Sequence, residues 1–149
     1  MTVPYGAIEY NEGGEFVVMK PDNNYTRKVN KIGMIAGGTG ISPMFQLIQK
    51  IISTKENTGM SLIYCAKSIE DLAFCEDLVK YDRSGRLTFY PVVETANVSN
   101  WMYGVGRLNP SMIEKYMPSP KGNFKMKNKL IKNNFVKNLY LHLFFILFR

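Results

Sequence analysis

The sequence has few of the side chains on which many enzymes depend. Its 149 residues include one histidine, His142, and two cysteines, Cys65 and Cys75. Without a histidine before position 142, the central part of the chain cannot hold a Ser-His-Asp triad or a Cys-His nucleophile. It also lacks the His and Cys sets of common metal sites. We therefore expect no catalytic side chain and no metal ligand, and His142 is assigned no role.

Disulfide frameworks and membrane spans are also missing. Two cysteines ten positions apart favour a reducing, intracellular setting and inert core thiols. The chain opens without a charged and then apolar leader, and no apolar run reaches the roughly 18 residues that cross a bilayer. The apolar stretch Leu139–Phe148 is interrupted by His142 and is long enough only to seek an interface. We expect membrane association only through segments absent from this chain.

Acidic residues are absent after Pro120, and this absence accounts for the formal net charge of +7. Residues 1–120 hold twelve Lys and Arg residues and all twelve Asp and Glu residues. Residues 121–149 hold seven basic residues and no acid. Because the excess charge lies outside the balanced part, a basic patch on the fold is not supported, and we expect no nucleic-acid partner.

The most informative feature that is present is a glycine-rich turn. Ile32–Ala36 predicts a buried strand, and three glycines follow at once: Gly37, Gly38 and Gly40. Ser42 suits the N-cap and Pro43 the first position of a helix predicted over Ser42–Ser53. Glycines let a backbone approach a ligand closely, and a helix N-terminus attracts phosphate groups. The unit therefore predicts a pyrophosphate site, with a purely structural tight turn as the alternative.

Strand and helix patterns alternate through the centre of the chain. The predicted strands are Ile32–Ala36, Met60–Ala66 and Leu87–Val93, and the predicted helices are Ser42–Ser53, Ile69–Tyr81 and Pro110–Tyr116. Glu70 and Asp71 fall in the first turn of the second helix, where the helix dipole favours acids. This alternation predicts an α/β fold with a parallel, doubly wound, Rossmann-like sheet, and the glycine turn makes it a predicted nucleotide-binding domain.

The two ends of the chain have other patterns. Residues 5–19 alternate loosely around Gly13-Gly14 and predict a β-hairpin, and the polar segment Lys20–Lys31 predicts a linker. Residues 121–149 contain almost only Lys, Asn, Phe, Leu, Ile and Tyr. This atypical basic and apolar tail is either a divergent C-terminus or the translated A/T-rich non-coding end of a truncated or mis-spliced gene product. We favour the second interpretation.

The string Gly37-Gly38-Thr39-Gly40-Ile41-Ser42-Pro43-Met44 resembles the pyridine-nucleotide motif of the ferredoxin reductase superfamily, and within it the NADH-cytochrome b5 reductase branch. Pro4-Tyr5-Gly6 and Gly13-Gly14-Glu15-Phe16 resemble the last hairpin of that family's flavin barrel. Trp101 and Tyr103-Gly104-Val105-Gly106 resemble its Trp-x-Tyr-Gly-x-Gly turn. The resemblance implies three parts: residues 1–30 as the end of the FAD-binding barrel and a linker, residues 31–120 as the NAD-binding domain, and residues 121–149 as the tail.

The resemblance implies an oxidoreductase that moves hydride from NADH to FAD and then electrons to cytochrome b5 or a similar haem protein. It implies NADH and FAD as cofactors and an intracellular location on the cytosolic side, where family members are often anchored to the endoplasmic reticulum or the mitochondrial outer membrane. The family's Arg-x-Tyr-Ser/Thr flavin segment and its Cys-Gly-Pro-Pro segment are absent here. We therefore expect a truncated chain, and the alternatives are a nucleotide-binding module or a fragment without catalytic activity.

The expected cofactor-binding residues are Gly37, Gly38, Thr39, Gly40, Ile41, Ser42, Pro43, Met44 and Glu94. The Thr39 hydroxyl faces either the cofactor, which we favour, or only the turn backbone. Glu94 ends the third predicted strand, where an acid can bond an adenosine ribose and repel a 2′-phosphate, which favours NADH over NADPH. A solvated surface acid is the alternative. We interpret Trp101 as an aromatic that packs over a loop.

Overall fold

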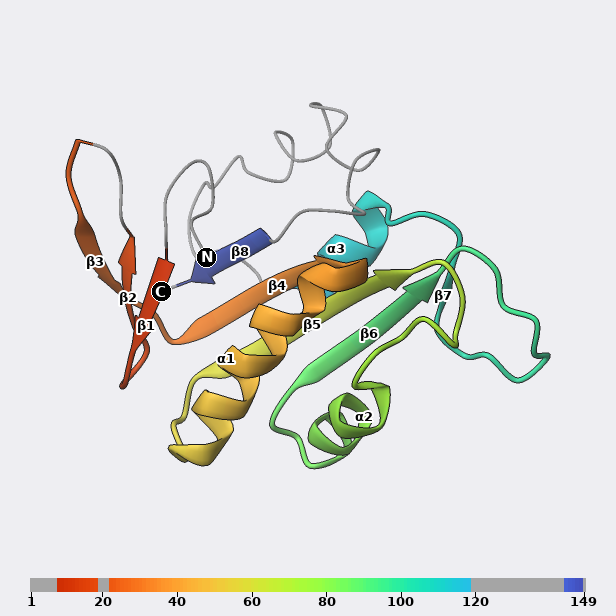
Figure 1. Ribbon diagram of the computed structural model, residues 1–149, viewed down its shortest axis with the longest axis horizontal. Coiled ribbons are helices and arrows are strands. Elements are labelled where there is room, and N and C mark those ends of the chain that lie inside the picture. The colour runs from red at the N-terminus through yellow and green to blue at the C-terminus, as the bar shows by residue number, and fades with distance from the viewer. Residues whose placement is uncertain (1–7, 19–21, 119–143, 149) are drawn as a thin grey trace.

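The computed structural model describes residues 8–18, 22–118 and 144–148, which form two sheets (Figure 1). The first sheet is antiparallel and has the order β1-β2-β3. Its strands are β1 (Ile8–Asn11), β2 (Glu15–Val18) and β3 (Tyr25–Lys28). The expectations for Pro4-Tyr5-Gly6 and for most of the tail, residues 121–143 with His142, lie outside the described residues.

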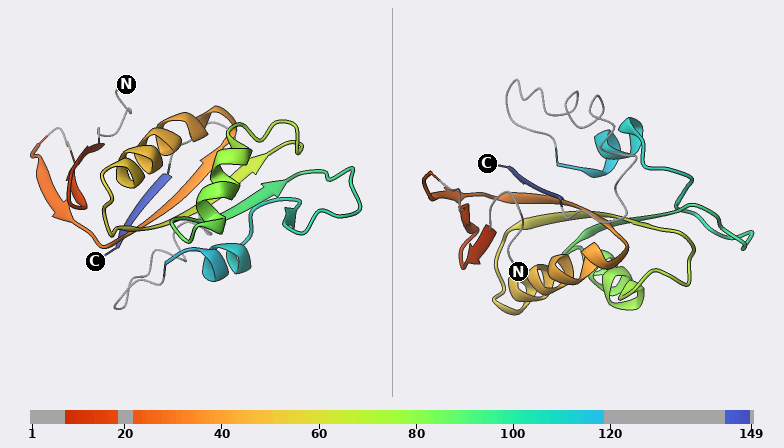
Figure 2. Two further views of the ribbon diagram at one scale, coloured as in Figure 1. Left: turned by 90° about the horizontal axis from the view of Figure 1, so that it is seen from below. Right: turned by 45° about the horizontal axis from the view of Figure 1, so that its top comes forward.

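The second sheet has the order β7-β6-β5-β4-β8, and its first four strands run parallel. These strands are β4 (Lys31–Gly37), β5 (Gly59–Ala66), β6 (Thr88–Val93) and β7 (Gly104–Val105). The helices are α1 (Ile41–Ser53), α2 (Cys75–Arg83) and α3 (Pro110–Tyr116). Figure 2 shows α1 and α2 on one face of this sheet and α3 on the other. The predicted Rossmann-like α/β fold is therefore confirmed.

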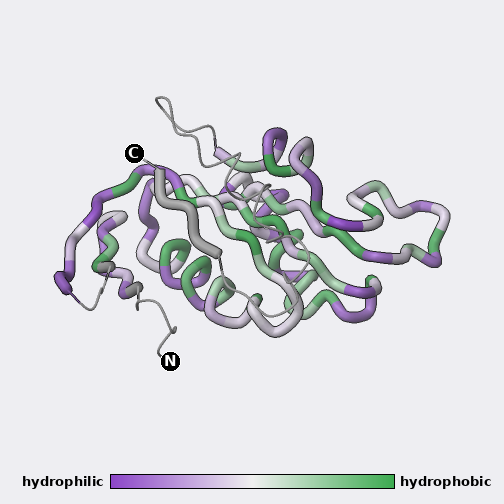
Figure 3. Tube along the Cα trace, turned by 90° about the horizontal axis from the view of Figure 1, so that it is seen from above, coloured by the Kyte–Doolittle hydropathy of each residue, from purple (hydrophilic) through white to green (hydrophobic). Residues whose placement is uncertain are grey.

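The parallel sheet is buried on both faces, as its apolar strands require. Successive strand residues point to opposite faces, so Met34 joins the core cluster under α1 while Ile35 joins the cluster under α3. The cluster under α3 contains Ile35, Ile63, Val92, Leu108, Ile113 and Met117. Figure 3 shows apolar positions concentrated along the central strands and polar positions in the loops.

The N-terminal hairpin is confirmed, but the predicted linker is partly wrong. β1 pairs with β2 from Asn11 opposite Glu15, and the turn between them contains Gly13 and Gly14, both with positive φ. Tyr25–Lys28, expected to be linker, pairs with β2 as a third strand. Aromatic and β-branched residues favour strands, and pairing supplies the backbone hydrogen bonds that each segment needs. The polar residues on either side of Tyr25–Lys28 made the segment resemble a linker, so its strand propensity was not recognised.

The second predicted helix, Ile69–Tyr81, begins later than expected, because α2 starts at Cys75. The preceding segment is held in an irregular path, in which the Ala73 N–H donates to the Tyr64 hydroxyl (3.3 Å). Phe74 then takes a positive φ of 60°, which a helix does not allow. The acids in the first turn of α2 are therefore Glu76 and Asp77, not Glu70 and Asp71.

β8 (Phe144–Phe148) is a strand that the sequence did not predict. It pairs antiparallel with β4, with Phe144 opposite Ile35 and Phe148 opposite Lys31. The five residues of β8 are aromatic or apolar and have high strand propensity. The outer edge of β4 offers unpaired backbone groups to such a segment. The part of the tail expected to seek an interface therefore includes a segment that pairs with the sheet edge.

Deleting residues 144–149 should leave the outer edge of β4 without β8 and lower the stability of the sheet. We expect a lower thermal midpoint and a higher average mass in light scattering, because an unpaired edge recruits strands from other molecules. Deleting Arg149 alone is the matched control and should change neither quantity. An unchanged midpoint and mass in the longer deletion would show that β8 does not stabilise the sheet.

Candidate functional site

The turn after β4 owes its shape to Gly38. Gly37 is still extended, with φ −128° and ψ 131°, and Gly38 then takes a φ of 50°. This left-handed conformation is costly for residues with a Cβ atom but open to glycine. The chain makes one short 3-10 turn, Gly38–Gly40, and passes directly into α1. A strand, a glycine turn and a helix therefore follow one another, as the sequence predicted.

The predicted helix start is wrong by one residue. α1 begins at Ile41 with Gly40 at the N-cap and no side-chain cap, so Ser42 is not the N-cap and Pro43 is not the first helical residue. The 3-10 turn replaces the side-chain cap, because the Ile41 N–H donates to the carbonyls of Gly38 and Thr39. Pro43 still lies in the first turn, where a missing N–H leaves no helical carbonyl unpaired.

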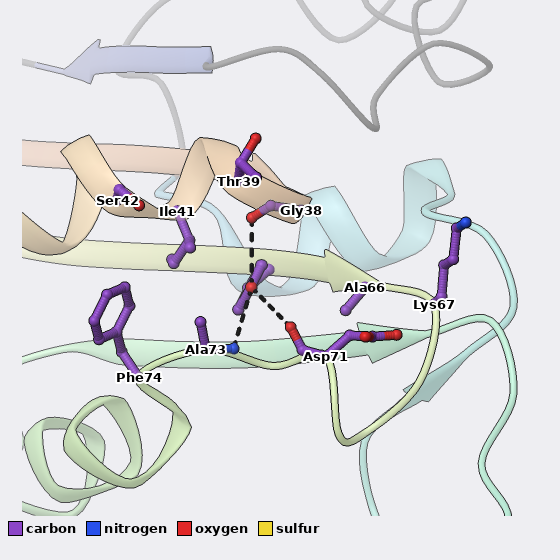
Figure 4. Close-up of a pocket in the computed structure, with 10 residues that line it drawn as sticks. Gly38, Thr39, Ile41, Ser42, Ala66, Lys67, Asp71, Ala73 and Phe74 are labelled. Carbon is purple, nitrogen blue, oxygen red and sulfur yellow. Dashed lines mark hydrogen bonds between the residues drawn. The ribbon is translucent and has the colours of Figure 1, made fainter.

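A cavity of about 640 Å³ opens beside this turn. It lies at the carboxyl ends of β4 and β5, the edge at which open α/β sheets bind ligands. Its lining comes from the glycine turn, the start of α1, the end of β5 and the segment before α2 (Figure 4). The lining residues are Gly38, Thr39, Ile41, Ser42, Tyr64, Ala66, Lys67, Asp71, Ala73 and Phe74.

The Tyr64 hydroxyl joins three of these segments. It lies 3.4 Å from the carbonyl oxygen of Gly38 and 3.2 Å from that of Asp71, and it can donate its proton to either. It also accepts the N–H of Ala73. Burial raises the pKa of this hydroxyl, and the charge of Asp71 adds to the increase. The group is therefore a neutral donor at ordinary pH.

Phe74 forms one wall of the cavity and is backed by a second aromatic ring. Phe74 stacks on Phe45 of α1, with ring centroids 4.2 Å apart and an angle of 6° between the planes. Phe45 is buried, whereas Phe74 is 42% exposed. The pair therefore presents an aromatic surface at the cavity, which suits contact with a planar ring.

Glu94 lies beside the cavity but is not among the residues that line it. It directly follows β6 and its side chain is exposed. The Glu94 N–H donates to the carbonyl of Ala66 (3.1 Å), and the Thr95 N–H donates to the carbonyl of Lys67 (3.3 Å). Ala66 and Lys67 both line the cavity, so the backbone holds Glu94 at the same edge.

The structure divides the predicted site residues into two groups. Those that line the cavity are Gly38, Thr39, Ile41 and Ser42. Gly37, Gly40, Pro43 and Glu94 flank it, and Met44 is fully buried in the core. Sequence reasoning missed the lining residues Tyr64, Ala66, Lys67, Asp71, Ala73 and Phe74. Residues at the end of β5 could have been predicted to line the site. Met60–Ala66 was predicted as the neighbouring strand, and ligands bind at the edge of the sheet where parallel strands have their carboxyl ends.

Cys65, Cys75 and Trp101, which the sequence analysis also considered, lie in surroundings that fit structural roles. Burial raises the pKa of Cys65 to about 12 and also raises that of Cys75, so both free thiols stay protonated at neutral pH. The Trp101 Nε1–H donates to the carbonyl of Gly104 (3.1 Å), and its ring meets Tyr103 edge-on. The raised pKa values agree with the interpretation of the cysteines as inert core thiols. The contacts of Trp101 agree with its interpretation as an aromatic that packs over a loop.

Within the described ranges, 8–18, 22–118 and 144–148, no three His, Cys, Asp or Glu side chains are grouped closely enough to hold a metal ion. None of the helices there has the length and apolar character needed to cross a membrane.

Replacing Tyr64 with Phe should destabilise the fold by about 1–2 kcal/mol, because the Ala73 N–H and the nearby carbonyls lose a hydrogen-bond partner. Urea unfolding measures this loss. Tyr81→Phe on α2, whose hydroxyl lies outside the cavity lining, is the matched control and should cost less than about 0.5 kcal/mol. Equal stabilities of the Tyr64→Phe and parent chains would contradict the role assigned to the hydroxyl.

Known structures share this fold. The cytochrome b5 reductase domain of Ulva prolifera nitrate reductase superposes with a TM-score of 0.71 at 21% identity, covering 94% of this chain and 55% of that one. The CS-b5R domains of human Ncb5or, in the NAD+ form, superpose with a TM-score of 0.55 at 20% identity, covering 72% of this chain and 32% of that one. These likenesses support the fold.

Sequence comparison identifies the family. Nitrate reductase [NADH] 1 of Oryza sativa subsp. japonica is 31% identical over an alignment of 121 residues, and the match covers 77% of this chain and 13% of that protein. The chain therefore spans a small part of the curated relatives that it matches. Residues 34–129 match the family model described as "Oxidoreductase NAD-binding domain". The chain belongs to this family of oxidoreductase NAD-binding domains of the ferredoxin reductase type, and its predicted likeness to cytochrome b5 reductases is confirmed.

Proposed function

We propose that the cavity beside the glycine turn binds NADH, with the diphosphate against Gly38, Thr39, Gly40 and the start of α1. The observation that carries this proposal is the left-handed Gly38 at a strand-to-helix turn that opens into a cavity of about 640 Å³. A glycine at this point leaves the backbone open to an approaching phosphate, and the first turn of a helix favours negative charge. Gly37, Ile41, Ser42, Pro43 and Met44 complete the proposed binding segment.

The other lining residues fit the chemistry of a dinucleotide. The cavity volume falls within the range of about 300–1,000 Å³ typical of small-molecule sites. Lys67 contributes a positive charge at its rim, which favours a diphosphate. The ring of Phe74, which is stacked on the buried Phe45, offers a surface to one of the planar rings of the ligand. The Ile41 N–H is already bonded within the turn, so it contributes less than the sequence suggested.

We further propose that the chain serves an NADH-dependent oxidoreductase of the cytochrome b5 reductase type, located inside the cell on its cytosolic side. In such a protein, hydride passes from NADH to FAD, and electrons then pass to cytochrome b5 or a similar haem protein. The support is the membership in an oxidoreductase NAD-binding family and the likeness to NADH-dependent nitrate reductases. The described residues carry no Arg-x-Tyr-Ser/Thr flavin motif, so they do not fit FAD.

Glu94 is the proposed determinant of nucleotide choice. If its carboxylate faces the adenosine ribose, NADH should bind more tightly than NADPH, and Glu94→Ala should narrow the difference by about two- to fivefold, the size of one exposed charge interaction. Isothermal titration at low salt measures both affinities, because salt screens exposed charges.

The matched control for Glu94 is Glu70→Ala. Glu70 is an exposed acid of the loop after β5 that does not line the cavity, and its removal should leave the preference unchanged. Equal affinities for both nucleotides in the parent chain would remove Glu94 from the site.

The alternative function is that of a nucleotide-binding module without catalysis, and one observation favours it for the 149-residue chain on its own. The family's flavin segment is absent from this sequence, whereas hydride transfer requires the reacting rings to lie about 3–3.5 Å apart. The purified chain should therefore show no flavin absorbance after desalting and no NADH-dependent reduction of ferricyanide, even with added FAD. Robust NADH oxidation with stoichiometric bound FAD would contradict this expectation.

A further inference from the structure

We propose that Glu56 is a positioning residue that fixes the N-terminal antiparallel sheet on the nucleotide-binding domain. Glu56 lies between the end of α1 and the start of β5, whereas the cavity lies at the other end of β5. The contact itself is independent of the ligand. Its consequence rests on the proposed function: a flavin barrel continued from this sheet would be held in a defined orientation to the bound nucleotide.

Hydrogen bonds from the hairpin converge on one oxygen of Glu56. The Tyr10 hydroxyl on β1 and the N–H of Gly14 (3.2 Å) both donate to Oε2. The Thr54 hydroxyl donates to Oε1 at 2.9 Å. Removing the carboxylate therefore leaves two hairpin donors without this acceptor, and the cost of such unpaired groups exceeds that of losing one exposed bond.

The backbone of Glu56 is held as firmly as its side chain. The Arg86 guanidinium donates to the Glu56 carbonyl (2.6 Å), and the Glu56 N–H donates to the carbonyl of Ile51 (3.2 Å). Arg86 lies just before β6, separated from it by Leu87, and Ile51 is a core residue of α1. The carboxylate is therefore presented from the nucleotide-binding domain in a fixed direction.

The hairpin turn is closely packed at Gly14. The Val29 N–H donates to the carbonyl of Gly14 (2.8 Å), which extends the pairing of β2 with β3 by one residue. A Cβ atom on Gly14 would lie 2.4 Å from the Val29 carbonyl oxygen and 3.4 Å from the Thr58 hydroxyl oxygen of the nucleotide-binding domain. Phe16, two residues further, is 1% exposed and belongs to the main core cluster. Packing thus brings the hairpin to the domain, and Glu56 selects one orientation for it.

A second polar contact spans the same junction and provides a control. Lys50 on α1 pairs with Glu12 of the hairpin turn at 2.8 Å, with side chains 50% and 68% exposed. Exposed pairs of this kind contribute little to stability. Replacing Glu12 therefore removes a charge from the hairpin while leaving the bonds to Glu56 in place.

The charge of Glu56 gives the junction a pH dependence. Burial raises the pKa of Glu56, but the hydrogen bonds from Tyr10 and Thr54 outweigh this effect and hold its pKa below the usual value. Burial and the carboxylate raise the pKa of Tyr10, so its hydroxyl remains a donor. The other charged groups facing the junction are Glu12, Lys50 and Arg86. The stabilisation is present above the ordinary carboxyl pKa and is lost as the pH falls through the lowered value.

Hydrogen exchange of the full 149-residue chain tests the proposal. In Glu56→Ala, the amides of β2 should lose protection by about tenfold, whereas those of β5 should keep it. Tyr10→Phe keeps the ring against Phe16 and should give a smaller loss in the same strands. Glu12→Ala should change protection less than twofold. On acidification, the hairpin amides of the parent chain should lose protection. The same amides in Glu56→Gln should lose less, because residue 56 then carries no charge to titrate.

Three results would overturn the proposal: unchanged β2 protection in Glu56→Ala, an equal loss in β2 and β5, or the same acid response in Glu56→Gln and the parent chain. NADH titration of the same variants separates this proposal from the proposed function. Glu56→Ala should bind NADH with the parent affinity, because residue 56 lies far from the cavity lining. A parent chain that binds no NADH would overturn the proposed function while leaving the exchange result interpretable.

Discussion

The hydroxyl of Tyr64 lies where the glycine turn, β5 and the segment before α2 meet, and the shape of the cavity depends on its hydrogen bonds. The ring is 1% exposed, so its position is fixed by the core. From there the hydroxyl reaches the carbonyls of Gly38 and Asp71 and the N–H of Ala73. The same bonds hold the segment before α2 out of the helix and allow Phe74 to stack on Phe45.

The cavity and the junction with the antiparallel sheet lie at opposite ends of the parallel sheet. At the carboxyl ends of the strands, the left-handed Gly38 keeps the backbone accessible beside the cavity. At the opposite end, Glu56 holds the antiparallel sheet through its bonds from Tyr10 and Gly14. A ligand site and a domain junction can therefore vary independently, although both depend on the same strand, β5, and on the apolar core that surrounds it.

Local signals predicted most of the fold, and long-range contacts explain what they missed. The apolar runs of β4, β5 and β6 and the glycine turn are short-range patterns, so the parallel sheet and the turn could be predicted. The later start of α2 could not, because the hydrogen bond that the Ala73 N–H donates to the hydroxyl of Tyr64 on β5 overrides the helical pattern. β3 and β8 depend on pairing partners elsewhere in the chain. The cavity wall formed by Phe74 depends on a positive φ that sequence patterns do not indicate.

The central claim is that the glycine turn and the end of β5 form a dinucleotide site, and an NMR titration of the isotope-labelled chain with NADH tests it most directly. The account predicts saturable amide shifts that are largest at Gly38–Ser42 and in the segment from Tyr64 to Phe74, with small shifts in the antiparallel sheet. Saturable shifts centred elsewhere would contradict this claim. The absence of shifts at about 1 mM NADH, near the upper end of the KM values of enzymes, would contradict it as well.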